Sequence, residues 1–264
     1  MYENKKLEDL NLSDSFLFAF AMSDKGICKE FLEKLLMIDI EELEIVKSEW
    51  TQDVGYAAKS VRFDIYARAR DGQIYEIEMQ NANKGNIPKR SRYYSSIIDT
   101  KELSKGSDYN KLPQSYVIFI CTFDPFGDGR HIYTFENICV ENHEIRLQDG
   151  SKKVTLNTRG TMDDVSDEIK DFLKYVEKST AETAELSSGS LTRHMHGIVT
   201  KIKDERQVDY MTFLELIKDE KDESFKEGVE QEKLKNAKAM KDAGIKQSVI
   251  SNITGLSAEE IMAL

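Results

Sequence analysis

Apolar and polar side chains alternate in two neighbouring segments of the chain, residues 61–68 and 74–80. Every second position of these segments is apolar: Val61, Phe63, Ile65 and Ala67 in the first, Tyr75, Ile77 and Met79 in the second. Side chains of a β-strand point to opposite faces in turn, so each segment predicts a strand with one apolar and one charged face. The Asp71-Gly72 pair between them is typical of a turn, and we expect a hairpin.

The length of the hairpin loop decides which residues of the two strands face each other. A two-residue turn would place the two apolar sets on opposite faces of the sheet. A three-residue loop from Arg70 to Gly72, with Gly72 left-handed as a bulge, unites the apolar sets on one face. Counting outward from that loop puts Asp64 directly opposite Glu78. The pattern therefore predicts two carboxylates as cross-strand neighbours.

Two carboxylates that face each other favour a bound cation. Like charges in this position destabilise a sheet by roughly 0.2 to 1 kcal/mol, and by more when they are partly buried. Carboxylates combined with a backbone carbonyl suit Mg2+ or Mn2+. The alternative is an ordinary half-exposed hairpin whose acids point into water beside Arg62 and Arg68, because charged outer faces are usual in antiparallel strands. The spacing alone leaves both interpretations open.

Helical and extended patterns surround the hairpin. Between Asp14 and Phe123 we expect the order helix, strand, strand, strand, helix, strand. The first helix is capped by Ser13 or Asp14 and interrupted near 23–26, and a strand follows at about 43–50. After the hairpin we expect a helix from Pro88 to about Leu103 and a strand buried on both faces at 115–123.

The rest of the chain continues the sheet and then becomes helical. Alternation between His131 and Thr158 predicts further strands that extend the sheet. Beyond them we expect helices at 163–177 and 191–217, a charged connector from Asp219, and short helices at 233–264 that Gly244 and Gly255 punctuate, with Ser257 and Glu260 as a capping box.

Composition narrows the classes of protein that fit. The three cysteines are far apart and lack metal-site spacing, so they predict buried, reduced thiols of a cytoplasmic protein. No signal core and no membrane-spanning run is found. The net charge of −11 weighs against a nucleic-acid partner, yet residues 84–111 carry seven cations against three acids, while residues 204–232 carry eleven acids against four cations. The acidity is therefore concentrated away from the hairpin.

Three cations, Lys89, Arg90 and Arg92, lie at the start of the expected helix from Pro88. Cations in a first turn oppose the helix dipole at a cost of about 0.3 to 1 kcal/mol each, and a bound phosphate would relieve that conflict. We interpret the cluster as a contact with the DNA backbone. The alternative is a solvated helix end paired with nearby acids.

Several motifs in order resemble one known family. They are Asp14, FDIY at Phe63, EIEMQ at Glu76, KRSRYYSSIID at Lys89, KGSDYNKLPQSYVIFIC at Lys105 and TGLS at Thr254. Together they resemble the Rpn family of recombination-promoting nucleases, also described as transposases, within the PD-(D/E)XK nuclease superfamily. The resemblance covers nearly the whole chain. It implies an α/β fold with a restriction-endonuclease-like core, a mixed central sheet flanked by helices, and a helical C-terminal extension.

The resemblance also implies roles for individual residues. Asp64 matches the first metal-binding aspartate and Glu78 the second acid, and the backbone carbonyl of Met79 is a further expected ligand of Mg2+, for which Mn2+ can substitute. Gln80 stands where the superfamily more often has a lysine, so it can position the attacking water only through hydrogen bonds.

Two further acids are candidates for a supporting role. Glu76 lies on the same strand face as Glu78 and is either a base behind the metal ligands or an exposed acid. Asp14 is either a water-mediated metal contact or a plain helix cap.

The resulting hypothesis is a Mg2+-dependent DNA endonuclease connected with recombination or mobile elements. Its parts are a nuclease-like core at 1–160, a helical extension packed on it at 161–218, and a charged connector with a small helical tail at 219–264. One alternative is a catalytically weak or inactive DNA-binding, transposon-derived protein that retains the scaffold. Another is an interaction module in which the acidic tail acts. The pattern of the tail is typical of a small helix-turn-helix. Such a tail could contact DNA, or it could mediate oligomerisation, for example as a homodimer.

Overall fold

A computed structural model describes residues 5–52 and 61–264 of the chain. The side chains of Trp50, Val61, Arg62 and Phe63, to which the sequence pattern assigns positions, lie outside the described part. The chain divides into two compact units, one that ends at Gln207 and one that covers Val208–Leu264. Over the described residues, no helix combines the length and apolar composition needed to cross a bilayer.

The first unit is built on a mixed sheet of six strands in the order β1-β2-β3-β4-β6-β5. The strands are β1 (Leu43–Gln52), β2 (Val61–Ala69), β3 (Ile74–Gln80), β4 (Ser115–Cys121), β5 (Ile132–Phe135) and β6 (Ser151–Asn157). Strands β1, β2 and β3 are antiparallel neighbours, β3, β4 and β6 run parallel, and β5 returns antiparallel to β6. The expected mixed sheet, with additional strands after β4, is confirmed.

The hairpin of β2 and β3 has the expected loop. The main-chain N–H of Ala69 donates to the carbonyl of Gln73, and that of Gly72 donates to the carbonyl of Ala69, both at 2.9 Å. Gly72 has φ +91°, a conformation that costs little only for glycine. The three-residue loop sets the register in which Ile65 pairs with Ile77. The register expected from the sequence is therefore confirmed.

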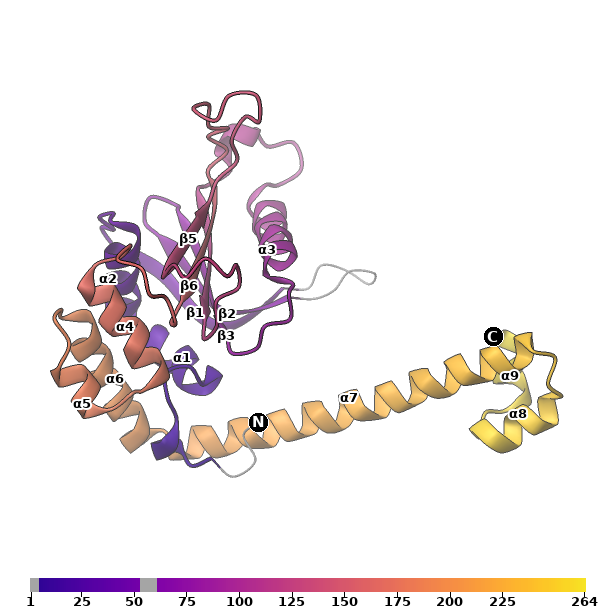
Figure 1. The fold of residues 1–264 in the computed structure, drawn as a ribbon. Coiled ribbons are helices and arrows are strands. Elements are labelled where there is room, and N and C mark those ends of the chain that lie inside the picture. The colour runs from indigo at the N-terminus through magenta and orange to yellow at the C-terminus, as the bar shows by residue number, and fades with distance from the viewer. Residues whose placement is uncertain (1–4, 53–60) are drawn as a thin grey trace. The chain divides into compact units, whose positions relative to one another are not determined.

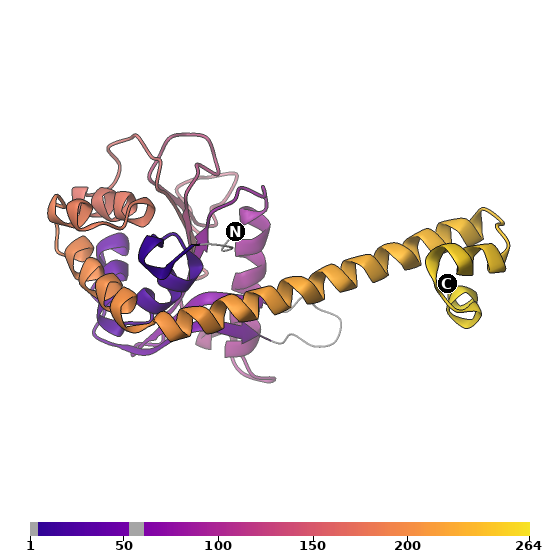
Figure 2. The same cartoon turned by 90° about the horizontal axis from the view of Figure 1, so that it is seen from below.

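Helices cover both faces of the sheet. Figures 1 and 2 show α3 on one face, and α1, α2, α4, α5 and α6 grouped on the other side. Their bounds are α1 (Ser15–Met22), α2 (Lys25–Leu36), α3 (Ile87–Glu102), α4 (Asp167–Glu177), α5 (Ala181–Glu185) and α6 (Leu191–Glu205). The interruption expected near 23–26 separates α1 from α2, where the Asp24 side chain accepts from the main chain of Ile27.

Helix α3 packs on the face formed by the even-numbered residues of β3 and the odd-numbered residues of β4. Its inward residues Ile87, Tyr94, Ile97 and Ile98 form one core cluster with Tyr66, Ile74, Val117, Phe119 and Cys121. The opposite face of the sheet is apolar and buried, as Ile65, Ile77 and Ile118 illustrate. Both faces of β3 and β4 therefore lie inside the unit.

Two segments of the first unit depart from the expected elements. The alternation after Phe135 does not continue as a strand: residues 136–150 are irregular, with one bridge between Ile138 and Arg146. Cys139 lies in this segment and is only partly buried, so the expectation of three buried thiols is wrong for it, whereas Cys28 and Cys121 are buried. Helix α5 falls between two expected helices. It is a single turn begun by Thr180, whose side chain accepts from Thr183 N–H, and its brevity leaves little apolar periodicity to detect.

The second unit is helical. It contains most of α7 (Gln207–Asp242), together with α8 (Gln247–Thr254) and α9 (Ala258–Ala263). The connector expected from Asp219 belongs to α7, because the segment has no proline and is rich in Glu and Lys, which favour helix. Gly244 and Gly255 have positive φ where α7 and α8 end, and Ser257 with Glu260 forms the expected capping box.

Candidate active site

Asp64 and Glu78 meet at the end of the hairpin away from its loop. The main-chain N–H of Asp64 donates to Oε1 of Glu78 at 3.2 Å, and the main-chain N–H of Met79 donates to Oδ2 of Asp64 at 2.9 Å. Each carboxylate thus reaches the backbone of the other strand. The two acids that the sequence pairs are brought together on the sheet face covered by α3.

The acids of β3 are not exposed. The exposed fraction is 0% for Glu76 and 1% for Glu78, and Asp64 is partly buried. The interpretation of the hairpin as half-exposed, with acids pointing into water, is therefore wrong for β3, because helix α3 covers this face. Sequence alternation cannot distinguish a charged face in water from one beneath a helix, since both have the same period.

Arg90 of α3 reaches into the site from above the sheet. Its Nη2 donates to Oε2 of Glu78 at 2.5 Å and to the hydroxyl of Tyr94 at 2.6 Å, and its Nη1 donates to Oε1 of Gln80 at 2.7 Å. The guanidinium also lies 5.4 Å from the centre of the Phe119 ring. Helical spacing places Arg90 on the buried side of α3, four residues before Tyr94 and three after Ile87, and that spacing is the signal by which the sequence could have revealed it.

Negative charge is concentrated around this arginine. The pKa of Glu78 is raised from its ordinary value of 4.5 to about 8, first by burial and then by the charge of Asp64, while Arg90 acts in the opposite direction. The pKa of Glu76 is raised well above its ordinary value by burial and by Glu78. Glu76 and Glu78 thus both act on the guanidinium of Arg90, and a further positive charge would stabilise their ionised forms.

Gln80 is the last residue of β3 and contacts the other groups of the site. Its Nε2 donates to the backbone carbonyl of Met79 at 2.7 Å and to Oε2 of Glu78 at 3.3 Å. The glutamine therefore touches two of the three expected metal ligands and also Arg90. A glutamine at this position holds its neighbours by hydrogen bonds, and the positive charge is supplied by Arg90.

The chemistry of these groups suits a hard divalent cation. Two carboxylates and one backbone carbonyl are oxygen ligands of the kind that Mg2+ and Mn2+ prefer. Both carboxylate oxygens of Glu76 are buried and have no hydrogen-bond partner among the described residues. In the part of the chain that the structure describes, no cluster of three or more His, Cys, Asp or Glu side chains is arranged to hold a metal. A site here would therefore rest on two acids and a carbonyl rather than on three side chains.

Asp14 is engaged with its own segment. Its Oδ2 accepts from the main-chain N–H of Asn11 at 2.9 Å, and its Oδ1 lies 3.0 Å from Nζ of Lys5. It occupies the N-cap position of α1, where its main-chain carbonyl accepts from Phe18 N–H at 2.9 Å, but its side chain makes no capping hydrogen bond. Asp14 and Asn81, which follows β3, line the same small pocket.

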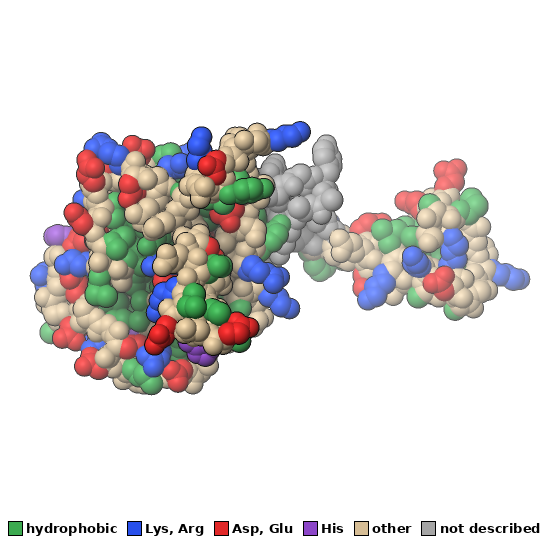
Figure 3. Space-filling view, turned by 90° about the horizontal axis from the view of Figure 1, so that it is seen from above, with side chains coloured by type: hydrophobic (Ala, Val, Ile, Leu, Met, Phe, Trp, Pro, Cys, Tyr) green, Lys and Arg blue, Asp and Glu red, His purple; other side chains and the backbone are tan. Residues whose placement is uncertain are grey.

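The three cations at the start of α3 point in different directions. Arg90 is committed to the acids, whereas Lys89 and Arg92 are exposed. The side chain of Asn86, at the N-cap of α3, makes no capping hydrogen bond, and the first turn contains no acid. The positive end of the helix dipole is therefore not offset by a side chain of that turn. On the face shown in Figure 3, basic and acidic side chains are intermixed. Contact between these cations and DNA stays a prediction.

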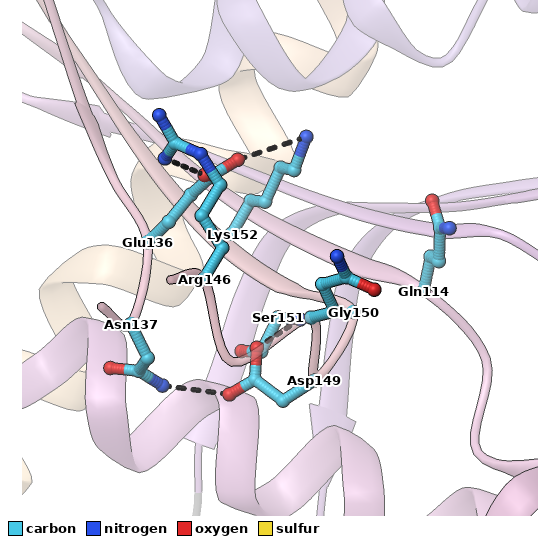
Figure 4. A pocket seen from close by; sticks show the side chains of 9 residues that line it. Gln114, Glu136, Asn137, Arg146, Asp149, Gly150, Ser151 and Lys152 are labelled. Carbon is cyan, nitrogen blue, oxygen red and sulfur yellow. Dashed lines mark hydrogen bonds and ion pairs between the residues drawn. The ribbon is translucent and has the colours of Figure 1, made fainter. Parts of the chain in front are cut away.

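A polar pocket of about 360 Å³ lies at the other end of the sheet, where β5 and β6 are joined. Figure 4 shows Arg146 and Lys152 pointing at Glu136, and Asn137 at Asp149. Glu136 pairs with Arg146 at 2.6 Å and with Lys152 at 3.2 Å, and Asn137 donates to Asp149 at 2.7 Å. These groups satisfy one another and hold the irregular segment in place, so the pocket offers little free charge to a ligand.

Comparison with known proteins identifies the family. The model of the PD-(D/E)XK nuclease family transposases matches residues 16–158, more than half of the chain, and this range includes the whole sheet with Asp64, Glu78 and Gln80. No curated protein and no solved structure gives a significant match. The mixed sheet with helices on both faces agrees with the restriction-endonuclease-like core expected for this family. The chain therefore belongs to the PD-(D/E)XK nuclease family of transposases.

Proposed function

We propose that this protein is a metal-dependent endonuclease that hydrolyses phosphodiester bonds of DNA in recombination or in the movement of mobile elements. The observation that carries the proposal is the meeting of Asp64 and Glu78 beside the carbonyl of Met79, where burial and the charge of Asp64 raise the pKa of Glu78. Family membership supports a nuclease or transposase-related role.

Asp64, Glu78 and the Met79 carbonyl would hold Mg2+, for which Mn2+ can substitute. When bound, such an ion lowers the pKa of a water molecule and neutralises charge on the phosphate. Asp64 lies in the first half of β2, and Glu78 and Met79 lie near the end of β3, so paired strands fix the backbones of all three. Rigid strands hold reacting groups more precisely than loops do.

The remaining side chains of the site position and balance the reacting groups. The Gln80 amide, next to the Met79 carbonyl, can accept from or donate to a water molecule that attacks phosphorus. Arg90 favours the ionised form of Glu78 and places a fixed positive charge near the phosphate, the task that a lysine at position 80 would otherwise perform. Glu76 holds a proton more readily than an ordinary glutamate because it is buried beside Glu78.

Cleavage of supercoiled plasmid tests this function. The full chain is incubated with plasmid and Mg2+, Mn2+ or Ca2+, beside Asp64→Asn and Glu78→Gln. We expect nicking with Mg2+ or Mn2+ that falls to background in both variants. The matched control is Glu182→Gln, which removes an exposed glutamate that pairs with Lys178. Equal nicking by the wild type and both variants would refute the proposal.

A second candidate function is DNA binding without efficient cleavage. It is favoured by Gln80 in place of lysine, and by the hydrogen bonds that already occupy Glu78. Calorimetric titration with Mn2+ separates the two, because a scaffold that has lost its chemistry need not bind the ion at Asp64 and Glu78. Binding of Mn2+ that both acid variants abolish supports the nuclease.

A further inference from the structure

An aromatic pocket lies on the same face of the sheet as the acids, on the other side of α3. Its volume is about 330 Å³, at the small end of the range for ligand sites. The residues that line it are Ile87, Pro88, Ser91, Arg92, Phe126, Phe135, Asn137, Lys153 and Thr155. Its walls are thus the first turns of α3, the loop after β4, and strands β5 and β6.

The strand register fixes the position of this pocket relative to the candidate active site. Glu78 of β3 pairs with Phe119 of β4, and Phe119 pairs with Thr155 of β6, so Glu78 and Thr155 lie in one row across the sheet. Residues paired in this way share a face. Neighbouring strands are about 4.8 Å apart, which puts the two positions about 10 Å from each other. Arg90 of α3 faces the acids, and Ser91 and Arg92 face the pocket.

Two phenylalanines give the pocket its character. Phe126 and Phe135 are 38% and 43% exposed, and their ring centres are 4.9 Å apart. Phe135 shares the row of Glu76 on the α3 face, since it pairs with Lys153, which pairs with Val117. Large aromatic rings left open to water at a pocket wall offer a flat surface for another ring.

The charged side chains that line the pocket are positive. Arg92 is exposed on α3, and Lys153 of β6 donates to the hydroxyl of Ser151 at 2.9 Å and lies near enough to Asp99 to act on its charge. No acid lines the pocket among the described residues. A nucleotide matches this combination, because its base can stack on the aromatic wall and its phosphate can contact the cationic rim.

We propose that the aromatic pocket binds an unpaired base of the DNA strand whose phosphate lies at Asp64 and Glu78. In a duplex each base is covered by its neighbours, and its face becomes available for stacking only when the strand is single or the base is extruded. The substrate class is therefore DNA with unpaired nucleotides. This inference rests on the proposed nuclease function, because it takes the acids as the place of the scissile phosphate.

Binding of fluorescent oligonucleotides tests the pocket independently of cleavage. The probes are oligothymidylate, an abasic strand of the same length, and a blunt duplex, each titrated by anisotropy with the full chain in Ca2+. Phe126→Leu combined with Phe135→Leu keeps apolar volume and removes both rings. We expect the wild type to prefer oligothymidylate, and the double variant to lose about five- to a hundredfold affinity for it with no change for the abasic strand. The control is Phe225→Leu, which removes a ring that is 73% exposed in the second unit and which we expect to change nothing.

The outcomes separate this proposal from the proposed function. Equal wild-type affinity for oligothymidylate and the abasic strand, tighter binding of the duplex, or the same loss in Phe225→Leu would overturn the pocket proposal, while plasmid nicking would still support the nuclease. Conversely, an absence of nicking by a wild type that discriminates the probes would overturn the nuclease and leave the pocket as a nucleotide site. Quenching of 2-aminopurine in the strand by the wild type but not by the double variant supports stacking directly.

Discussion

The guanidinium of Arg90 contacts the carboxylate of Glu78, and this contact ties helix α3 to strand β3 inside the candidate active site. The Glu78 side chain is 2% exposed and that of Arg90 28%, so the pair is largely shielded from water. Removing one partner of a buried ion pair leaves the other charge uncompensated. The arginine therefore has a structural role as well as the electrostatic one proposed for it.

Above pH 8, where Glu78 is ionised in the folded protein, Arg90→Ala is expected to destabilise the protein by roughly 3 kcal/mol, because Glu78 keeps its burial and loses its partner. Urea denaturation without divalent ions measures this as a lower midpoint. Arg92→Ala, an exposed change in the same helix, serves as the control and is expected to stay within about 0.5 kcal/mol of the wild type. Equal midpoints for Arg90→Ala and Arg92→Ala would contradict the structural role.

Metal binding is expected to depend on the side chains of two ligands and not on that of the third. Asp64→Asn and Glu78→Gln should abolish calorimetric binding of Mn2+, since each removes a charged oxygen ligand. Met79→Leu should retain it, because the proposed ligand there is the backbone carbonyl and the leucine fills a similar volume. Loss of binding in Met79→Leu with an intact fold would place the ligand elsewhere.

Stability without divalent ions is expected to fall as pH rises from about 5 to about 8. The folded protein holds a proton on Glu78 up to its raised pKa of about 8, whereas the unfolded chain releases it near 4.5. In that window the folded state binds more protons than the unfolded state, so the stabilisation present below pH 4.5 is lost as pH passes through 8. Urea midpoints measured across this range check the prediction.

Two comparisons identify the group responsible for this pH dependence. Glu78→Gln should flatten the profile, although Glu76 contributes in the same direction and leaves part of the slope. Saturating Mg2+ should flatten it as well, because a bound cation favours the ionised carboxylate. A profile that Mg2+ and Glu78→Gln both leave unchanged would show that the slope comes from other groups.

DNA affinity is expected to depend less steeply on salt when the exposed cations of α3 are removed. Lys89→Ala with Arg92→Ala should reduce the slope of log affinity against log salt by about 1.8 on duplex DNA, or about 1.4 on a single strand, if each contacts one phosphate. Lys101→Ala with Lys105→Ala, at the other end of α3, is the matched control. If both double variants showed the same salt dependence as the wild type, Lys89 and Arg92 would not belong to the DNA interface.

The second unit is expected to be dispensable for chemistry. A chain that ends at Ile217 keeps the whole sheet, α1 to α6 and the start of α7, together with every residue proposed for the site. We expect it to fold with the circular dichroism of a mixed α/β protein and to nick plasmid as the full chain does. Loss of nicking by a folded truncated chain would give the tail a role in substrate binding or assembly.

The sequence was sufficient to predict the hairpin and its pairing. Strand period and turn chemistry are local, so the positive φ of Gly72 and the approach of Asp64 to Glu78 followed from the residues between them. The pattern left open whether the charged face of β3 is exposed, because its cover, α3, comes later in the chain. Burial depends on which element packs on a face, and alternation does not carry that information.

The role of Arg90 was missed for a related reason. Its grouping with Lys89 and Arg92 is a grouping along the chain, whereas a helix distributes consecutive residues around its axis. The long helix α7 was missed because its charged sequence lacks an apolar stripe, although its residues favour helix one by one.

The site depends on the length of the three-residue loop at Arg70 to Gly72, although the loop itself lies away from the acids. Deleting one loop residue would shift the strands against each other by a single position, and every side chain of one strand would then move to the opposite surface relative to its partner. Both carboxylates would survive in the gene and yet no longer face a common ion. In related sequences, the number of residues in this turn is thus as informative about activity as the presence of the acids themselves.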